Sequence, residues 1–240
     1  MTDASPWRRV LLKCSGEALM GEGAFGIDFA ALDRIAGDIA EVRGLGVDVA
    51  VVVGGGNLFR GVRTAAKGMD RASADQMGML ATVMNGLALA DALERRGAPA
   101  VAMSAIPMPT VCAAYTRRDA AAALAAGSVV ISTAGTGNPF FTTDTAAALR
   151  AAELGCDLLA KGTQVDGVYS ADPKTDPSAT RFDRLSHDEV IARDLKVMDI
   201  AAIALTRENR IPVMVFDLHE AGGFAAALTG RGRSTTITDQ

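Results

Sequence analysis

The clearest indication of the fold is the stretch V-D-V-A-V-V-V-G-G-G-N-L-F-R-G, residues 47–61. Its first seven residues are almost all apolar, which predicts a strand covered on both faces. Three glycines follow at the end of that strand, where they let the backbone approach an anion and present N–H groups to it. Arg60 adds a guanidinium that can bind a phosphate at two points. A tight turn is the alternative, but a turn alone would not require three glycines. The stretch matches neither G-x-G-x-x-G nor the P-loop pattern.

Strand-like and helix-like segments alternate outward from this stretch in both directions. Further strands are predicted at residues 9–13, 100–103, 128–132, 157–161, 212–216 and 234–238. Further helices are predicted at residues 118–126, 143–154, 186–193, 199–208 and 224–228. This alternation predicts an α/β fold with a doubly wound, mainly parallel central sheet sandwiched by helices, in a single domain over residues 1–240.

Two longer helices can be predicted in more detail. The first has Asp28 as its N-cap and ends near Gly44 and Gly46. Its inward face comprises Leu32, Ile35, Ile39 and Val42. The second extends from about residue 73 to 96, and its helical spacing predicts an inward face of Met77, Leu80, Met84 and Leu87. The methionines Met77, Met79 and Met84 fit core filler or a subunit contact better than a ligand site.

Composition excludes several classes of protein. The chain has 240 residues, 24 Lys+Arg against 28 Asp+Glu and a formal charge of −4. Its mean hydropathy of +0.21 excludes wholesale disorder. No apolar stretch approaches the roughly 20 residues of a membrane span, and no signal peptide is apparent, so we expect a cytoplasmic protein without a membrane partner. The isoelectric point near 5.2 argues against nucleic-acid binding.

The cysteines and histidines favour no metal site. The three cysteines are an odd number without a C-x-x-C pair, which predicts reduced thiols rather than disulfides or zinc. The two histidines, His187 and His219, stand in polar, surface-like contexts, so a catalytic triad or a histidine metal site has little support.

Three further loops at predicted strand ends carry residues suited to a nucleotide. Lys13 and Ser15 follow the first strand, although a solvated lysine is the alternative there. Residues 133–144, T-A-G-T-G-N-P-F-F-T-T-D, place hydroxyls and N–H groups at a helix N-terminus, with two phenylalanines suited to stacking or closing a pocket. In the last loop, residues 161–169, Tyr169 offers a ring face to a purine. The carboxyl ends of parallel strands share one edge, so these loops should converge.

Six segments form a specific combination: L-L-K-C-S-G-E-A-L (residues 11–19), G-G-G-N-L-F-R-G (54–61), M-G-M-L-A-T-V-M-N-G (77–86), M-S-A-I-P (103–107), T-G-N-P-F-F-T-T-D (136–144) and K-V-M-D (196–199). The combination resembles the bacterial uridylate (UMP) kinases, a branch of the amino acid kinase family, over essentially the whole chain. K-x-S-G and the glycine-rich loop are shared across that family, whereas the third and fifth segments point to the UMP branch.

The resemblance implies reversible transfer of the γ-phosphoryl group of Mg-ATP to UMP, giving UDP in pyrimidine nucleotide biosynthesis. It also implies activation by GTP, inhibition by UTP and a homohexamer. Mg²⁺ would accompany ATP rather than occupy a dedicated protein cage. One alternative is a carbamate, aspartate or glutamate kinase of the same family. Another is a nucleotide-sensing subunit without catalysis, although the intact Lys13 and Arg60 argue against it.

The resemblance also assigns site residues. Candidate catalytic residues are Lys13, Arg60, Asp144 and Asp199. ATP contacts are expected from Lys13, Cys14, Ser15, Gly16, Gly56, Arg60, Thr163, Tyr169 and Asp172. UMP contacts are expected from Gly55, Asp75, Thr136, Gly137, Asn138, Pro139, Phe140, Phe141, Thr142 and Thr143. The GTP segment is Gly21, Glu22, Gly23, Ala24, Phe25 and Gly26. The UMP side would lie mostly in the first two thirds of the chain and the ATP side mostly in residues 160–240.

Two assignments within this set stay open. Asp144 and Asp199 are both candidates to orient Lys13 or Mg²⁺, but a helix N-cap explains Asp144 equally well. Lys161, at another predicted strand end, is a candidate second cation, and the sequence does not distinguish which residue fills that role.

Overall fold

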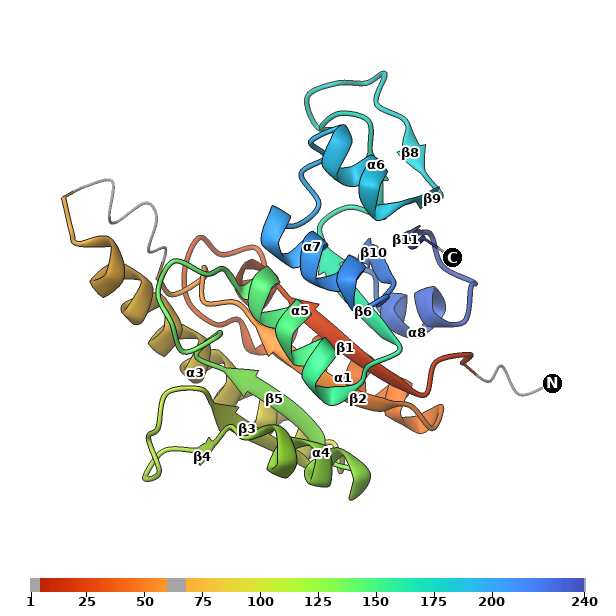
Figure 1. Cartoon of the computed structure of the whole chain (residues 1–240). Helices are drawn as coiled ribbons and strands as arrows, with labels where there is room; N and C mark the ends of the chain where they lie inside the picture. The colour runs from red at the N-terminus through yellow and green to blue at the C-terminus, as the bar shows by residue number, and fades with distance from the viewer. Residues whose placement is uncertain (1–4, 60–67, 240) are drawn as a thin grey trace.

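The computed structural model describes residues 5–59 and 68–239. Among these, nine strands form one sheet in the order β4-β3-β5-β2-β1-β6-β10-β11-β9 (Figure 1). The strands are β1 (Arg9–Cys14), β2 (Asp48–Val53), β3 (Ala100–Ser104), β4 (Ala113–Ala114), β5 (Val129–Thr133), β6 (Leu158–Thr163), β9 (Arg184–Leu185), β10 (Val213–Asp217) and β11 (Ser234–Ile237). Neighbouring strands pair in parallel except β10 with β11. The prediction of a doubly wound, mainly parallel α/β sheet is therefore confirmed.

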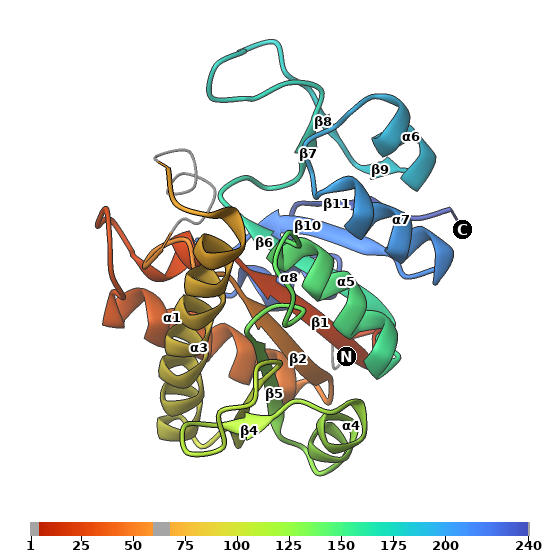
Figure 2. The ribbon, with the colours of Figure 1, turned by 60° about the vertical axis from the view of Figure 1, so that its left-hand side comes forward.

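Helices cover both faces of this sheet (Figure 2). One face packs against α1 (Phe29–Gly44), α3 (Arg71–Arg95) and α8 (Gly223–Leu228). The other packs against α4 (Arg117–Ala125), α5 (Thr143–Leu154) and α7 (Ile200–Glu208). Side chains alternate along β1, so Val10 and Leu12 join the first core and Leu11 the second, all fully buried. This two-sided burial explains why the central strands consist of continuous apolar runs.

Short elements absent from the sequence prediction complete the chain. They are the 3₁₀ helix η1 (Gly16–Leu19) and the antiparallel pair β7 (Val168–Tyr169) and β8 (Arg181–Phe182). The helix predicted at residues 186–193 is present as α6 (His187–Ala192). Two-residue strands carry too little periodicity to be detected in a sequence. No helix within residues 5–59 and 68–239 is long and apolar enough to cross a membrane. The cytoplasmic location stays a prediction from the sequence.

The N-terminus of α1 lies where its cap predicts. The Asp28 carboxylate accepts a hydrogen bond from the Ala31 N–H at 2.8 Å, which pairs one of the free donors of the first turn. The four predicted inward residues are buried in the first core: Leu32, Ile35, Ile39 and Val42. Local capping and helical spacing were therefore sufficient to place this helix.

The predicted inward face of α3 is wrong. Met77, Leu80, Met84 and Leu87 are exposed by 43%, 50%, 56% and 37%. The helix instead buries a face rich in small residues, because the sheet approaches it closely. At Gly86 a Cβ atom would lie 2.2 Å from Thr133 Cγ2, so only glycine fits. A row of bulky apolar residues thus remains on the outer surface of α3.

The surface-like setting predicted for His187 is also wrong. Its side chain is 2% exposed, and its Nδ1 lies 2.8 Å from a carboxylate oxygen of Asp239. The backbone N–H of His187 donates to the other oxygen of that carboxylate at 3.0 Å. The last described residues are thereby tied to the start of α6, a contact between segments too distant in sequence to be recognised from it.

Candidate active site

Two lysines and one carboxylate meet at the carboxyl edge of the sheet. Lys13 on β1 and Lys161 on β6 are register partners in adjacent parallel strands. Asp144, in the first turn of α5, lies between them: Lys13 Nζ is 2.9 Å from Oδ1 and Lys161 Nζ is 2.9 Å from Oδ2. All three side chains are at most 15% exposed. The cluster carries a net charge of +1 where a doubly wound sheet binds its ligands.

Burial and charge act in opposite directions on the cluster. Burial alone would raise the pKa of Asp144, but the charges of Lys13 and Lys161 outweigh it and the pKa is lowered. Burial lowers the pKa of Lys161, and Asp144 opposes part of that change. The Lys161 ammonium also donates to the Val197 carbonyl oxygen. Both candidate cations are therefore held in place by fixed acceptors before any ligand arrives.

The two candidate aspartates have different positions. Thr142, not Asp144, caps α5, with its hydroxyl accepting from the Asp144 N–H at 3.0 Å. The Asp144 carboxylate is thus available to both lysines. Asp199 is instead the N-cap of α7: it accepts the Ala202 N–H at 2.8 Å and the Thr145 hydroxyl at 2.8 Å. Its carboxylate joins α7 to α5 by accepting from the Thr142 and Thr145 hydroxyls.

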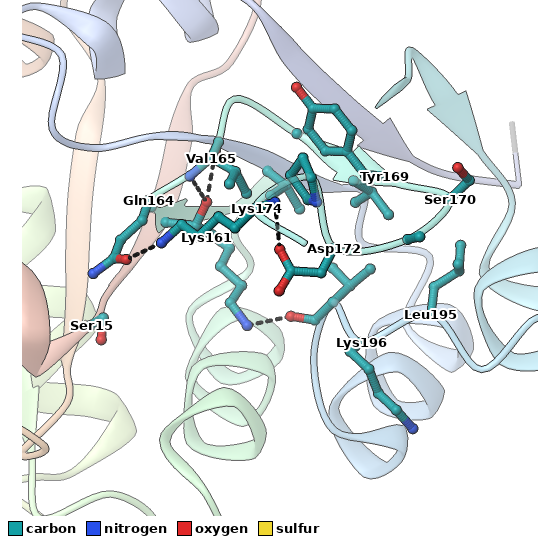
Figure 3. Close-up of a pocket in the computed structure, with 18 of the residues that line it drawn as sticks. Ser15, Lys161, Gln164, Val165, Tyr169, Ser170, Asp172, Lys174, Leu195 and Lys196 are labelled. Carbon is teal, nitrogen blue, oxygen red and sulfur yellow. Dashed lines mark hydrogen bonds between the residues drawn. The ribbon is translucent and has the colours of Figure 1, made fainter. Parts of the chain in front are cut away.

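A cavity of about 780 Å³ opens beside the cluster on the β6 side (Figure 3). Of the predicted ATP residues, it is lined by Lys13, Ser15, Thr163, Tyr169 and Asp172. Lys161 lies in the same wall. Further polar lining residues were absent from the sequence prediction: Glu17, Gln164, Lys174, Arg193, Lys196 and His219. Glu17 and Lys196 stand in two of the six segments that carry the family resemblance, whereas the other four residues stand outside those segments, so the sequence carried little signal for them.

Cys14 and Gly16, both predicted to contact ATP, do not line this cavity. Cys14 is fully buried, and burial raises the pKa of its thiol to about 12. Gly16 packs against the glycine-rich loop so closely that a Cβ atom would lie 2.7 Å from the Gly56 nitrogen. Cys14 and Gly16 therefore pack beneath the cavity wall and do not form its surface. Arg60 lies outside the described residues.

A second cavity, of about 260 Å³, lies on the side of the glycine-rich loop and α3. Of the predicted UMP residues it is lined by Gly55, Asp75, Thr136, Asn138, Phe141, Thr142 and Thr143. Gly56, predicted on the ATP side, lines this cavity, but a Cβ atom there would be 3.9 Å from Glu17 in the wall of the first. Gly137, Pro139 and Phe140 belong to the same loop without lining it. The two cavities are therefore neighbours, and Asp144 follows directly after Thr143.

Asp75 connects α3 to the loop that carries the phenylalanines. Its carboxylate accepts from Arg71 Nε at 2.8 Å and from the Phe140 N–H at 2.9 Å. Phe140 has a positive φ of 72°, unusual for a residue with a side chain, and this hydrogen bond holds it. Arg71 lines the second cavity and was absent from the sequence prediction. Its spacing of four residues before Asp75 was the available signal.

A buried amide pair joins the glycine-rich loop to two other elements. Asn57 and Asn85 exchange hydrogen bonds at 2.7 and 3.1 Å, and Asn85 also donates to the Gly54 carbonyl at 2.7 Å. Asn57 Nδ2 donates to the Gly26 carbonyl at 2.9 Å, and the Gly26 N–H donates back to the Asn57 carbonyl. The predicted GTP segment, exposed from Gly21 through Phe25, is thereby tied at its end to the glycine-rich loop.

Comparison with known proteins shows which family this chain belongs to. A sequence model described as "Amino acid kinase family" matches residues 8–217. The chain belongs to the amino acid kinase family. Uridylate kinases of Mesorhizobium japonicum and Agrobacterium fabrum are 63% and 61% identical to it over 239 and 240 residues, 100% of both chains in each case.

Solved members of the amino acid kinase family have the same fold. The crystal structure of UMP kinase from Bacillus anthracis matches with a TM-score of 0.94 and 36% identity, covering 98% of this chain and 97% of that one. UMP kinase from Ureaplasma parvum matches with a TM-score of 0.92 and 35% identity, covering 97% and 99%. The family match includes the lysine–aspartate cluster and all residues named above in both cavity walls except His219.

Proposed function

We propose that the chain transfers the γ-phosphoryl group of ATP to UMP, giving UDP and ADP, reversibly and as a step of pyrimidine nucleotide biosynthesis. The observation that carries the proposal is the Lys13–Asp144–Lys161 cluster between two neighbouring cavities. ATP would occupy the larger cavity and UMP the smaller one. A phosphate oxygen of UMP would attack the γ-phosphorus, and the bond to the leaving ADP oxygen would break. Fixed ammonium groups beside the transferred group stabilise the charge that spreads over its oxygens.

The cavity walls support this division of substrates. Thr142 and Thr143 open α5, where the positive end of the helix dipole favours the 5′-phosphate of UMP. Asp75 would accept from the ribose hydroxyls and Phe141 would border the uracil. In the larger cavity, Lys174, Arg193 and Lys196 add positive charge suited to a triphosphate. The single-domain organisation stays a prediction from the sequence.

The carboxylate of the cluster, Asp144, does not offer a ready metal site. Each Asp144 oxygen faces a lysine at 2.9 Å. Within the described residues no group of three or more His, Cys, Asp or Glu side chains is placed to hold a metal ion. We propose that Mg²⁺ is bound chiefly by the nucleotide phosphates, where it neutralises charge.

One assay distinguishes the candidate acceptors. ADP formation from ATP is measured with UMP, CMP, dCMP, aspartate or glutamate as the acceptor. Activity confined to UMP supports the proposal. Activity with an amino acid would favour another amino acid kinase, and ATP binding without ADP formation from any acceptor would favour a sensor.

The Asp75→Asn variant should raise the KM for UMP about tenfold, because a hydrogen bond to a charged acceptor contributes about 1.5–3 kcal/mol. The KM for ATP should change little, since Asp75 lines only the smaller cavity. Steady-state kinetics with each substrate varied in turn measures both values. Asp70→Asn is the matched control, because Asp70 is the exposed N-cap of α3 and asparagine caps equally well. If the KM for ATP rose more than the KM for UMP, Asp75 would contact ATP and not UMP, and the assignment would be wrong.

The proposal extends to activation by GTP and inhibition by UTP. The segment is exposed from Gly21 through Phe25, and Gly26 ties it to the glycine-rich loop through Asn57, which supports coupling between the two. Phe25, 73% exposed, makes little contribution to the core. Phe25→Ala should abolish GTP activation and leave the basal rate near that of the wild type. Phe29→Ala, equally exposed outside the segment, is the control. A GTP titration in which Phe25→Ala responds like the wild type would remove this segment from the regulatory site.

The proposal also includes a homo-oligomer, in keeping with the predicted hexamer. The exposed apolar row on α3, Met77, Leu80, Met84 and Leu87, supports it, because such rows mark association surfaces. Met84→Glu should lower the mass measured by sedimentation, because a buried carboxylate would lack a partner. Ile200→Glu, at an exposed position of α7, should leave that mass unchanged. An unaltered mass for Met84→Glu would exclude α3 as the contact.

A further inference from the structure

The loop between β5 and α5 begins with an unusual backbone. Ala134, Gly135 and Gly137 all have positive φ, of 59°, 57° and 79°. Two of them are glycines, which adopt this conformation readily, but Ala134 carries a side chain that disfavours it. Ala134 is also fully buried. Such a conformation persists only where neighbouring groups hold it.

Two buried polar side chains hold this turn. The Thr82 hydroxyl, on α3, accepts the Ala134 N–H at 2.7 Å. The Arg150 guanidinium, on α5, donates to the Gly135 carbonyl at 3.2 Å. These side chains belong to residues that are only 3% and 5% exposed. Thr82 reaches the second cavity wall, whereas Arg150 does not.

Arg150 is itself held by a platform of two residues. Its Nη1 lies 2.7 Å from Glu153 Oε2, which neutralises its charge. Its guanidinium carbon lies 3.8 Å from the centre of the Tyr115 ring. The Tyr115 hydroxyl donates to the same Glu153 oxygen at 2.7 Å. A planar guanidinium suits stacking and directed hydrogen bonds together, which lysine does not.

We propose that Arg150, supported by Tyr115 and Glu153, is a positioning residue that shapes the loop for the acceptor nucleotide. This inference rests on the proposed function, in which the second cavity takes UMP. Gly135, Thr136 and Asn138 line that cavity, and Thr142 and Thr143 begin the helix that carries Arg150. The arginine therefore fastens the start of the loop to the helix at its other end. Arg150 acts on UMP only through this backbone.

The test is Arg150→Met, which keeps a long apolar stem but leaves the Gly135 carbonyl without its charged donor. Loss of a hydrogen bond to a charged group predicts a rise of about tenfold in the UMP KM and Kd. The ATP KM and kcat should stay close to wild type. Arg117→Met is the matched control, because Arg117 donates to the Glu153 carbonyl from the exposed side and does not touch the loop. It should leave all four constants unchanged.

Hydrogen exchange supplies a readout that does not depend on catalysis. The Ala134 amide donates to the Thr82 hydroxyl and the Gly137 amide donates to the Ala134 carbonyl, so both should exchange faster in Arg150→Met than in Arg117→Met. Unchanged exchange, or a UMP KM equal to wild type in the folded variant, would overturn the proposal. So would an equal rise in the ATP KM.

If Arg150→Met does not fold, Arg150→Lys takes its place. Lysine retains the positive charge beside Glu153 but has no second fixed donor for Gly135, so the UMP KM should still rise several-fold. A wild-type KM in that variant would overturn the proposal. If the wild-type protein were inactive with UMP, the proposed function would be refuted. Hydrogen exchange would still test whether Arg150 holds the loop.

Discussion

Lys13→Ala is expected to lower kcat for UDP formation by about a hundredfold or more, the usual effect of removing one fixed donor from a developing charge. The Lys13 ammonium stands at the end of β1, in the wall of the larger cavity and 2.9 Å from Asp144. Its substitution leaves Lys161 as the remaining cation of the cluster. The UMP Kd should change little, because Lys13 does not line the smaller cavity.

Lys174→Ala is the matched control for Lys13→Ala. Lys174 lines the same cavity, but its ammonium donates to Gln164 Oε1 at 3.0 Å, away from Asp144. We expect a change confined to the ATP KM, with kcat near wild type. Single-turnover measurements separate the phosphoryl-transfer step from product release. A loss of UMP affinity at unchanged kcat in Lys13→Ala would refute its assignment to the transferred group.

Asn85→Leu is expected to lower the free energy of unfolding by about 3–5 kcal/mol, because each buried polar group left unpaired costs about 1–3 kcal/mol. Asn85 is fully buried, and the variant would leave both the Gly54 carbonyl and the Asn57 amide oxygen without this donor. Leucine has the same branched shape as asparagine and is larger, so no cavity accounts for the loss. Urea denaturation monitored by circular dichroism measures it.

Asn209→Ala provides the comparison for Asn85→Leu. Asn209 caps the exposed end of α7 and donates one hydrogen bond, to the Leu205 carbonyl at 2.9 Å. Water can replace that bond, so the free energy of unfolding should fall by no more than about 0.5 kcal/mol. Similar losses in the two variants would show that the buried amide pair contributes no more than a surface cap.

Elements governed by local interactions were predictable from the sequence. The strand β2 is a continuous apolar run ended by glycines, and Asp28 begins α1 with a side chain three residues from its donor. Both signals lie within a few residues of the element they define. The loops at the strand ends were predictable for the same reason, and sheet geometry then required them to converge.

The orientation of α3 was not predictable from its own sequence. Helical spacing indicated a face of bulky residues such as Met84, whereas the fold buries the face that contains Gly86. The reason is the short distance between α3 and β5, at which Thr133 occupies the space of a side chain. A hydrophobicity pattern ranks faces by their apolar content and cannot include the shape of the surface that they meet.

The sequence by itself determined the longer strands, the Asp28 cap of α1, the glycine-rich loops at the strand ends and a lysine at the end of β1. Only the tertiary structure decided the roles that identical residue types take. Asp144 bridges Lys13 and Lys161, while Asp199 caps a helix, although both stand at the start of a helix. Arg150 holds a loop 15 residues before it in the chain. Capping and strand formation depend on neighbours in the chain, but the pairing of a buried charge depends on groups that only the folded backbone brings within 3 Å.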